Sequence, residues 1–260
     1  MQGLRQTWND GGETLGAWLA VPSTISAEAT ARAGFDYVCI DTQHGPIEYS
    51  DAVPMIQAIL LGGSAPIVRV PWNEPGIIGK MLDAGAHGVI IPMVNTVAEA
   101  EAAVRACRYA PDGARSWGPT TVSMRTDVHY KQWAPDNVAV IPMIETTQAI
   151  ANLDDILAVP GIDAVYVGPA DLSLTLGLAP QNNDDEPAFI DALDTIVAAC
   201  RRAGVVPGIH SSGVLTGTRR AAGFRMITVT TELLAMKNGL AAELDLARSG
   251  ESGGESGAMY

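Results

Sequence analysis

Two carboxylates stand where the chain leaves apolar, strand-like runs, and these positions suggest metal chemistry. Glu145 closes the run Val138–Glu145, and Asp171 follows shortly after the run Asp163–Gly168. In an α/β barrel, catalytic residues project from such strand ends into the mouth. Carboxylate oxygens suit a hard divalent cation such as Mg²⁺ or Mn²⁺. Acids are also common at helix starts and as helix caps, so these two residues alone leave metal binding and ordinary capping both open.

Further charged residues lie near other predicted strand ends. His44 is a candidate general acid or base, although an isolated histidine is more often structural. Arg69 is embedded in an apolar run, and a buried guanidinium needs a carboxylate or an anionic ligand. Asp83 opposes the dipole at a helix end before Gly85, which suggests a nearby partner such as a histidine. His210, at the end of the seventh strand-like run, could line the same mouth.

The segment Gly168–Ser173 turns from a strand into a helix and could bind a carboxylate. The backbone N–H groups of Ala170 and Asp171 are free at a helix start, where the helix dipole favours an anion. Pro169 has no N–H group, so the anion must lie beyond it. An ordinary capped helix start explains the same residues equally well.

The positions of the lysines argue against one mechanism of carbon–carbon bond cleavage. The chain has three lysines, Lys80, Lys131 and Lys237, and all of them fall outside the predicted strand ends. A Schiff-base aldolase needs a lysine directed into the mouth. If this protein stabilises a carbanion, we therefore expect a metal, and no Schiff-base lysine, to supply the electron sink.

Short β-branched runs alternate with longer amphipathic ones along the whole chain, which favours a single (β/α)₈ (TIM) barrel of the α/β class. A doubly wound open sheet is the second possibility. The glycine-rich loop that such a sheet uses for dinucleotides does not follow the first strand, so we expect no nucleotide cofactor. The predicted strands are Thr14–Ala20, Tyr37–Asp41, Ile67–Val70, Gly88–Ile91, Val138–Ile144, Ala164–Val167, Val205–Ile209 and Met226–Thr230.

Two segments interrupt this alternation. Tyr109–Asn137 is rich in proline and glycine and is predicted to be a long loop, near the N-terminal end of the barrel by chain direction. Residues 249–260 consist mainly of glycine, serine and glutamate and are predicted to be a flexible tail. We therefore expect one barrel domain over residues 1–248, followed by this tail.

Composition excludes several classes of function. A formal net charge of -13 argues against a nucleic-acid partner, which needs a basic surface. No apolar run approaches the length of a membrane span, and no secretory leader opens the chain, so we expect a cytoplasmic protein without membrane contact. Cys39, Cys107 and Cys200 lack metal-type spacing and are predicted to be reduced core residues.

Six short blocks at or near strand ends form an ordered set. They are Asp41–Gly45, Val68–Pro71, Leu82–Gly85, Ile91–Asn95, Glu145–Thr146 and Gly168–Ser173. Together they resemble the metal-dependent (class II) pyruvate aldolases of the HpcH/HpaI family. The resemblance runs from about Leu15 to Leu240, nearly the whole folded chain. It implies a lyase with a (β/α)₈ barrel that assembles as a homohexamer, a trimer of dimers, by exchanging its last helix.

The resemblance also implies roles for the site residues. Glu145 and Asp171 would bind a divalent metal, Mg²⁺, Mn²⁺ or Co²⁺. A 2-oxo acid such as pyruvate would chelate this metal, with its carboxylate also meeting the backbone of the Gly168–Asp171 turn near Ala170. Arg69 would stabilise the enolate that forms when an aldehyde is released.

His44 would be the acid/base residue, and Asp83 would be the acid that raises the basicity of His44. The small-molecule partners would be a 4-hydroxy-2-oxo acid, a 2-oxo acid such as pyruvate or hydroxypyruvate, and an aldehyde.

The chain departs from the family pattern at two positions. Members commonly carry a glutamine where this chain has Met143, which cannot donate an amide hydrogen bond to the 2-oxo acid. Members often carry a glutamate where this chain has Gln43. A decarboxylase of the oxaloacetate type and a non-catalytic barrel that binds metal and oxo acid therefore stay as alternatives, but binding alone would not require His44, Arg69 and Asp83.

Overall fold

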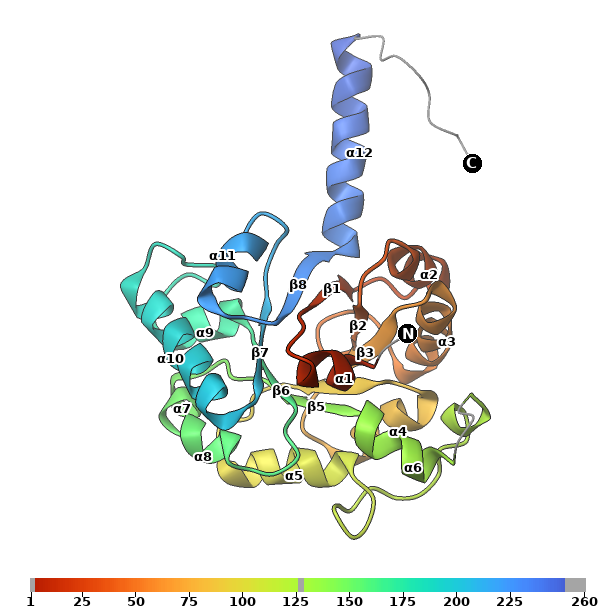
Figure 1. Ribbon diagram of the computed structural model, residues 1–260. Helices are drawn as coiled ribbons and strands as arrows, with labels where there is room; N and C mark the ends of the chain where they lie inside the picture. Colours follow the sequence, from red (N-terminus) through yellow and green to blue (C-terminus); the bar gives the residue numbers. More distant parts are fainter. Residues whose placement is uncertain (1–2, 126–128, 251–260) are drawn as a thin grey trace.

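The computed structural model describes residues 3–125 and 129–250 and shows a barrel of eight parallel strands surrounded by helices (Figure 1). The predicted (β/α)₈ fold is confirmed. The strands follow the order β5-β4-β3-β2-β1-β8-β7-β6. Their bounds are β1 Thr14–Leu19, β2 Tyr37–Asp41, β3 Ala65–Arg69, β4 Gly88–Ile91, β5 Ala139–Pro142, β6 Ala164–Val167, β7 Val206–His210 and β8 Met226–Thr231.

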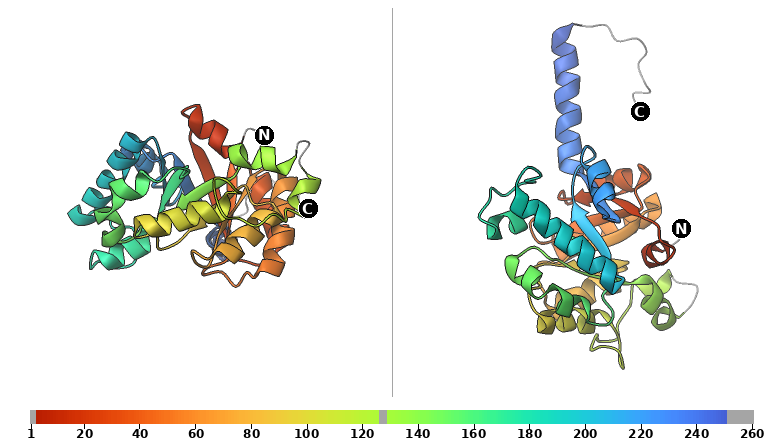
Figure 2. Two further views of the ribbon diagram at one scale, coloured as in Figure 1. Left: turned by 90° about the horizontal axis from the view of Figure 1, so that it is seen from below. Right: turned by 60° about the vertical axis from the view of Figure 1, so that its left-hand side comes forward.

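The helices lie outside the strands, apart from α1 at one end of the barrel and α12, which projects from it (Figures 1 and 2). They are α1 Leu4–Asn9, α2 Thr24–Arg32, α3 Tyr49–Gly62, α4 Pro75–Ala84, α5 Val97–Cys107, α6 Tyr130–Asn137, α7 Thr147–Ala151, α8 Leu153–Leu157, α9 Pro169–Thr175, α10 Pro187–Ala203, α11 Thr216–Ala222 and α12 Glu232–Ser249, with a 3₁₀ turn, η1, at Val122–Met124.

The barrel closes between β5 and β6 through a few specific contacts. Met143 and Tyr166 form a parallel bridge near the C-terminal ends of these strands, and Ile144 N–H donates to the Tyr166 carbonyl at 2.9 Å. Near the other end, the Asp163 carboxylate accepts from Val140 N–H at 2.9 Å. The closing contact near the C-terminal ends therefore lies beside the predicted site residues.

Local sequence explains where the helices stop. Gly85, Gly204 and Gly223 cap α4, α10 and α11 in the left-handed conformation, which glycine adopts without steric cost. Each of these glycines ends its helix just before the next strand, which is β4, β7 and β8, respectively. At these three positions the chain returns to the N-terminal end of the barrel.

The strands are buried on both faces, and the protein therefore has two layers of apolar side chains. One layer fills the barrel interior and includes Trp18, Tyr37, Ile67 and Tyr166, while the other lies between strands and helices. Helix α1 adds Leu4 to the inner layer and so covers the N-terminal end of the barrel. The three cysteines are buried and free, as predicted.

The segment 109–137 is more ordered than the sequence predicted. Its last part, Tyr130–Asn137, is α6, and Val122–Met124 is a 3₁₀ turn, whereas a loop was predicted throughout; residues 126–128 lie outside the described part. A loop was predicted because proline disfavours the interior of a helix. Pro135 nevertheless lies within α6, a short helix that ends two residues later. The position at the N-terminal end agrees with the prediction, because α6 leads directly into β5.

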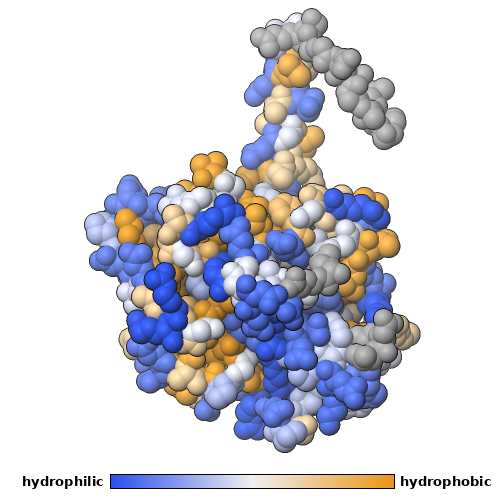
Figure 3. All heavy atoms as spheres, viewed as in Figure 1, coloured by the Kyte–Doolittle hydropathy of each residue, from blue (hydrophilic) through white to orange (hydrophobic). Residues whose placement is uncertain are grey.

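Helix α12 extends away from the barrel and carries apolar side chains into solvent (Figure 3). Leu233, Met236, Leu240 and Leu244 are between 44% and 65% exposed. Its first residue, Glu232, anchors the helix by accepting from two backbone N–H groups after β1 at 2.7 Å each. Of the predicted tail, Ser249 ends α12, Gly250 caps it, and the rest lies outside the described residues. No helix among residues 3–125 and 129–250 is long and apolar enough to cross a membrane.

Candidate active site

A cavity of about 500 Å³ opens at the C-terminal ends of the strands, and six of the residues predicted for the mouth line it. They are His44, Arg69, Gly168, Ala170, Asp171 and His210. Because the C-terminal ends of all eight strands meet there, residues far apart in sequence come together in one mouth.

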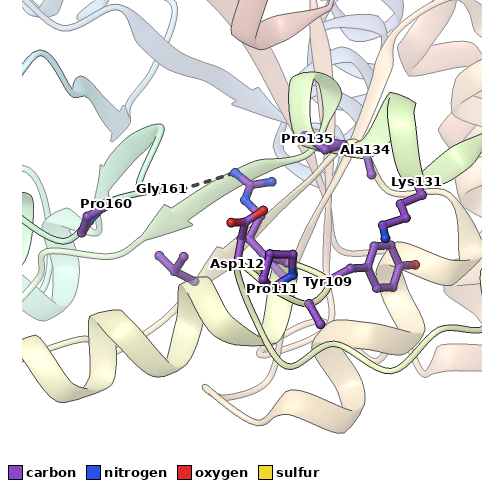
Figure 4. A pocket seen from close by; sticks show the side chains of 12 residues that line it. Tyr109, Pro111, Asp112, Lys131, Ala134, Pro135, Pro160 and Gly161 are labelled. Carbon is purple, nitrogen blue, oxygen red and sulfur yellow. Dashed lines mark hydrogen bonds between the residues drawn. The ribbon is translucent and has the colours of Figure 1, made fainter.

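Another hollow, of about 390 Å³, lies at the N-terminal end between α5, α6 and the preceding loop (Figure 4). Tyr109, Pro111, Lys131 and Pro160 are among its lining residues. Arg108 reaches across it to the Gly161 carbonyl at 3.4 Å. All predicted site residues lie elsewhere, so the mouth is the candidate active site.

Glu145 is buried immediately behind the cavity, just after β5, and is 2% exposed. Its Oε1 accepts a hydrogen bond from Met93 N–H at 2.8 Å. Met93 holds a positive φ of 56°, a strained conformation for a non-glycine residue. The backbone after β4 is therefore bent at this carboxylate, a feature that was not predicted from the sequence.

The pKa of Glu145 is raised to about 7. Burial is the main cause and the charge of Asp171 adds to it, whereas the Met93 N–H and the Arg69 charge oppose the rise. Two carboxylates that repel each other in a desolvated position gain most from a bound cation. This is the electrostatic arrangement that a divalent metal fits.

Asp171 projects from the first turn of α9 into the same cavity. The described residues hold no cluster of three or more His, Cys, Asp or Glu side chains suited to a metal. Glu145 and Asp171 would therefore be the protein's two charged ligands, and water or substrate oxygens would complete the coordination shell. Carboxylates together with water and substrate oxygens are typical of Mg²⁺ sites.

Gly168 makes room for the Glu145 carboxylate. A Cβ atom at this position would lie 2.5 Å from Glu145 Oε2 and 2.9 Å from Met143 Cε. Gly168→Ala is therefore expected to displace Glu145 and weaken divalent-metal binding about 10- to 100-fold, as the loss of a supporting contact does at other metal sites.

Isothermal titration with Mn²⁺ measures this effect. Gly79→Ala is the matched control, because a Cβ at Gly79 meets nothing within 4 Å and the residue lies within α4. Unchanged Mn²⁺ affinity in Gly168→Ala would contradict the assignment of Glu145 as a ligand.

The start of α9 leaves backbone donors for a carboxylate. Leu172 N–H is bonded to the Gly168 carbonyl at 3.0 Å, which closes the first helical turn. The N–H groups just before it, at Ala170 and Asp171, precede this bond and belong to residues that line the cavity. They could bind a small carboxylate beside Glu145 and Asp171.

Arg69 and Asp41 form a buried ion pair at the mouth. They are register partners on β3 and β2, and Arg69 donates from Nε to Asp41 Oδ1 at 2.9 Å and from Nη2 to Oδ2 at 2.5 Å. Burial favours the neutral acid, but Arg69 outweighs this and holds the pKa of Asp41 below its ordinary value. Trp18 also donates to Asp41 Oδ2 at 3.2 Å and stacks under the guanidinium. The need of Arg69 for a carboxylate or an anion was predicted from its apolar surroundings, whereas Asp41 as its partner was not.

His44 lies on the turn after β2 with its side chain exposed to the cavity. Asp41 Oδ1 accepts from the backbone N–H groups of Gln43 and His44, at 3.0 and 3.2 Å. Asp41 thus positions both the guanidinium of Arg69 and the turn that carries His44.

Asp83 lies far from this group. It accepts from Arg115 Nη2 at 2.6 Å, near the C-terminal end of α4, which leads into the start of β4. His44 follows the other end of a strand, so the two residues occupy opposite ends of the barrel. The nearby partner predicted for Asp83 is therefore Arg115 and not a histidine, and Asp83 does not support His44 within one chain.

Comparisons with known proteins show the family of this chain. The family described as HpcH/HpaI aldolase/citrate lyase matches residues 14–238. The chain belongs to this family.

Relatives named as aldolases are similar over most of the chain. A hydroxypyruvate/pyruvate aldolase from Rhizorhabdus wittichii is 44% identical over 90% of this chain and 93% of its own length. A 4-hydroxy-2-oxo-heptane-1,7-dioate aldolase from Shigella flexneri is 38% identical over 92% and 89%, respectively.

A crystal structure of a family protein from Burkholderia cenocepacia superposes with a TM-score of 0.88 at 34% identity, covering 95% of this chain and all of that one. The expected family, fold and carbon–carbon lyase (aldolase) activity are thereby confirmed.

Proposed function

We propose that this chain is a metal-dependent aldolase that cleaves and forms 4-hydroxy-2-oxo acids, with pyruvate or hydroxypyruvate as one product and an aldehyde as the other. The observation that carries the proposal is the pair Glu145 and Asp171 beside Arg69, with His44 lining the same cavity. The names of the relatives support this substrate class.

A divalent ion, Mg²⁺, Mn²⁺ or Co²⁺, would be held by Glu145 and Asp171. When bound, it would act as a Lewis acid on the 2-oxo group of the substrate. The backbone N–H groups of Ala170 and Asp171 bind the substrate carboxylate and so fix which end of the molecule faces the ion.

Arg69 stabilises the negative charge that develops on the 2-oxo acid when the C3–C4 bond breaks. Its guanidinium is held in a fixed orientation by two hydrogen bonds to Asp41 and by the Trp18 ring. A donor that is already oriented costs no rearrangement at the moment of reaction. His44 takes the proton of the 4-hydroxyl group, directly or through one water, and the aldehyde is released.

Proton competition at Glu145 should make metal binding depend on pH. The metal-free pKa is raised to about 7, so below pH 7 the ion must displace a proton from this carboxyl. We expect the apparent Mn²⁺ affinity to fall about tenfold for each pH unit below 7 and to level off above it. Titration calorimetry at pH 5.5, 6.5, 7.5 and 8.5 measures the profile, and a profile flat down to pH 5.5 would contradict the shifted pKa.

We further propose a homohexamer in which α12 packs on a neighbouring copy. Its exposed leucines gain from burial that one chain does not supply. Because Asp83 and His44 lie at opposite ends of one barrel, Asp83 could raise the basicity of His44 only from a neighbouring copy.

A panel of aldehydes with pyruvate and with hydroxypyruvate, run with each of the three metals, tests the proposed function. New 4-hydroxy-2-oxo acids should form only with a metal present, and borohydride with pyruvate should trap no adduct on a lysine. His44→Ala should lose aldol cleavage and retain metal affinity. A trapped lysine adduct, or loss of metal from His44→Ala, would contradict the assigned roles.

A further inference from the structure

A line of hydrogen-bonded side chains runs through the barrel interior to the mouth. Tyr37 OH lies 2.9 Å from Thr228 Oγ1, and Thr228 Oγ1 lies 2.6 Å from Tyr166 OH. Tyr166 OH in turn lies 3.4 Å from His210 Nδ1. The first three residues are fully buried, and His210 lines the candidate active site.

The protons along this line have a preferred direction. Each hydroxyl group has one proton to donate, and the buried Tyr37 phenol finds its acceptor in Thr228. The three hydroxyl groups have three protons for the three hydrogen bonds of the line. All three are placed if Tyr37 donates to Thr228, Thr228 to Tyr166, and Tyr166 to His210 Nδ1. A proton on Nδ1 would leave one buried hydroxyl proton without a partner in this line. An unprotonated Nδ1, with the ring proton on Nε2, is therefore the arrangement that satisfies every proton of the line.

The surroundings keep the His210 ring neutral and fix its orientation. Burial and the positive charge of Arg69 lower the pKa of His210 to about 4, against the opposing charge of Asp41. The ring stands edge-on to Trp18, with centroids 5.1 Å apart and planes at 84°. Because Nδ1 is directed at Tyr166, Nε2 is on the opposite side of the ring.

The two aromatic side chains that contact His210, Trp18 and Tyr166, have no spare donor. Trp18 Nε1–H is used by Asp41, Tyr166 OH is used within the line, and Met143 has no donor at all. His210 Nε2–H is thus a neutral, oriented donor beside two aromatic rings, in a cavity that Gln181 and Asn182 also line. Arg69, the stronger donor, is the group that attracts a charged oxygen, so the histidine suits an uncharged one.

We propose that His210 is a specificity-determining residue whose Nε2–H group binds a substrate hydroxyl on or next to the reacting carbon, so that the enzyme favours hydroxylated substrates. This inference rests on the proposed function. The hydroxyl group has two possible sources, the C3 hydroxyl of hydroxypyruvate or the 2-hydroxyl of an acceptor such as glycolaldehyde. A site that hydrogen-bonds a hydroxyl group discriminates against the analogue that lacks it.

Selectivity ratios in the full-length, metal-loaded enzyme test the proposal. One arm compares kcat/KM for hydroxypyruvate and pyruvate with one aldehyde, and the other compares glycolaldehyde and propanal with one 2-oxo acid. His210→Leu should lower the kcat/KM ratio of one of these two arms about tenfold, which corresponds to the loss of one hydrogen bond. The arm that changes shows whether the hydroxyl group belongs to the 2-oxo acid or to the aldehyde. His210→Gln, which retains a donor, should restore part of the ratio.

His87→Leu is the control for loss of an enclosed imidazole, because His87 precedes β4 at the other end of the barrel and packs edge-on against Trp133. Both ratios should stay at the wild-type value in this variant. Nitrogen-15 NMR of the histidine rings gives a second readout that does not depend on turnover. His210 should show a proton on Nε2 in the wild type and lose this fixed tautomer in Tyr166→Phe.

Ratios that do not change in His210→Leu, or a proton on Nδ1, would overturn the proposal and leave the proposed aldolase function intact. A wild-type enzyme that is inactive with every pair of substrates would overturn both.

Discussion

Glu145→Gln is expected to abolish divalent-metal binding and to lower aldol cleavage by at least about 1,000-fold. Glu145 is one of the two charged ligands of the proposed site, and a neutral amide there leaves Asp171 as the remaining carboxylate. Metal polarisation of a carbonyl contributes several kcal/mol to the transition state, and about 4 kcal/mol corresponds to this loss in rate. Mn²⁺ titration and pyruvate release from a 4-hydroxy-2-oxo acid measure the two effects.

The folding stability of Glu145→Gln shows whether a loss of activity comes from the missing ligand or from a misfolded protein. The amide keeps the size of the side chain, can still accept from Met93 N–H, and removes the repulsion between Glu145 and Asp171. The metal-free variant should therefore be at least as stable above pH 7 as the metal-free wild type. Glu13→Gln, at an exposed pair with Arg220, is the control and should retain metal and activity. Full Mn²⁺ affinity in Glu145→Gln would overturn the metal site.

Arg69→Lys is expected to lower kcat/KM about 100- to 1,000-fold while leaving metal affinity within a few-fold of the wild type. Lysine keeps the charge but not the planar fork that donates to both oxygens of Asp41. The donor that faces the developing negative charge is then no longer fixed, and loss of one such donor typically has an effect of this size. Steady-state kinetics together with Mn²⁺ titration measure the separation of rate and binding.

Two controls accompany this variant. Arg5→Lys alters an arginine paired with Asp163 at the N-terminal end and should leave kcat/KM unchanged. Asp41→Asn leaves Arg69 in place but weakens its orientation, so it should also lower kcat/KM, because Asp41 positions both Arg69 and the turn of His44. Wild-type kinetics in Arg69→Lys would show that the guanidinium does not act on the substrate.

The sequence predicted the barrel well because its strands are buried on both faces and its helices end at glycines. Tyr37–Asp41, Gly88–Ile91 and Ala164–Val167 were predicted with the observed bounds. Patterns of this kind are local, so they can be read without knowing which strands pair. Helix α6 was missed because it is short and contains Pro135.

The site was predicted less completely because its contacts join distant segments. Asp41 begins one of the six sequence blocks that resemble the family. Its pairing with Arg69, however, depends on the register of β2 and β3. The bend at Met93 is a backbone feature without a residue signature. The line from Tyr37 to His210 crosses the barrel interior, where one face of each strand meets strands that are far away in sequence.

Asp83 shows the opposite case, in which a family resemblance suggested a role that one chain cannot fulfil. Asp83 lies at the end of α4, and helices in this barrel run back towards the N-terminal ends of the strands, so Asp83 lies away from the mouth. Its partner there is Arg115. The role of Asp83 in catalysis stays a prediction that depends on assembly.

Release of pyruvate from a 4-hydroxy-2-oxo acid, measured before and after removal of metal from the wild-type protein, tests the metal-dependent mechanism most directly. With EDTA the release should stop, and added Mg²⁺, Mn²⁺ or Co²⁺ should restore it in the wild type but not in Glu145→Gln. Full activity in the presence of the chelator, or equal restoration in Glu145→Gln, would contradict a mechanism that depends on a metal held by Glu145 and Asp171.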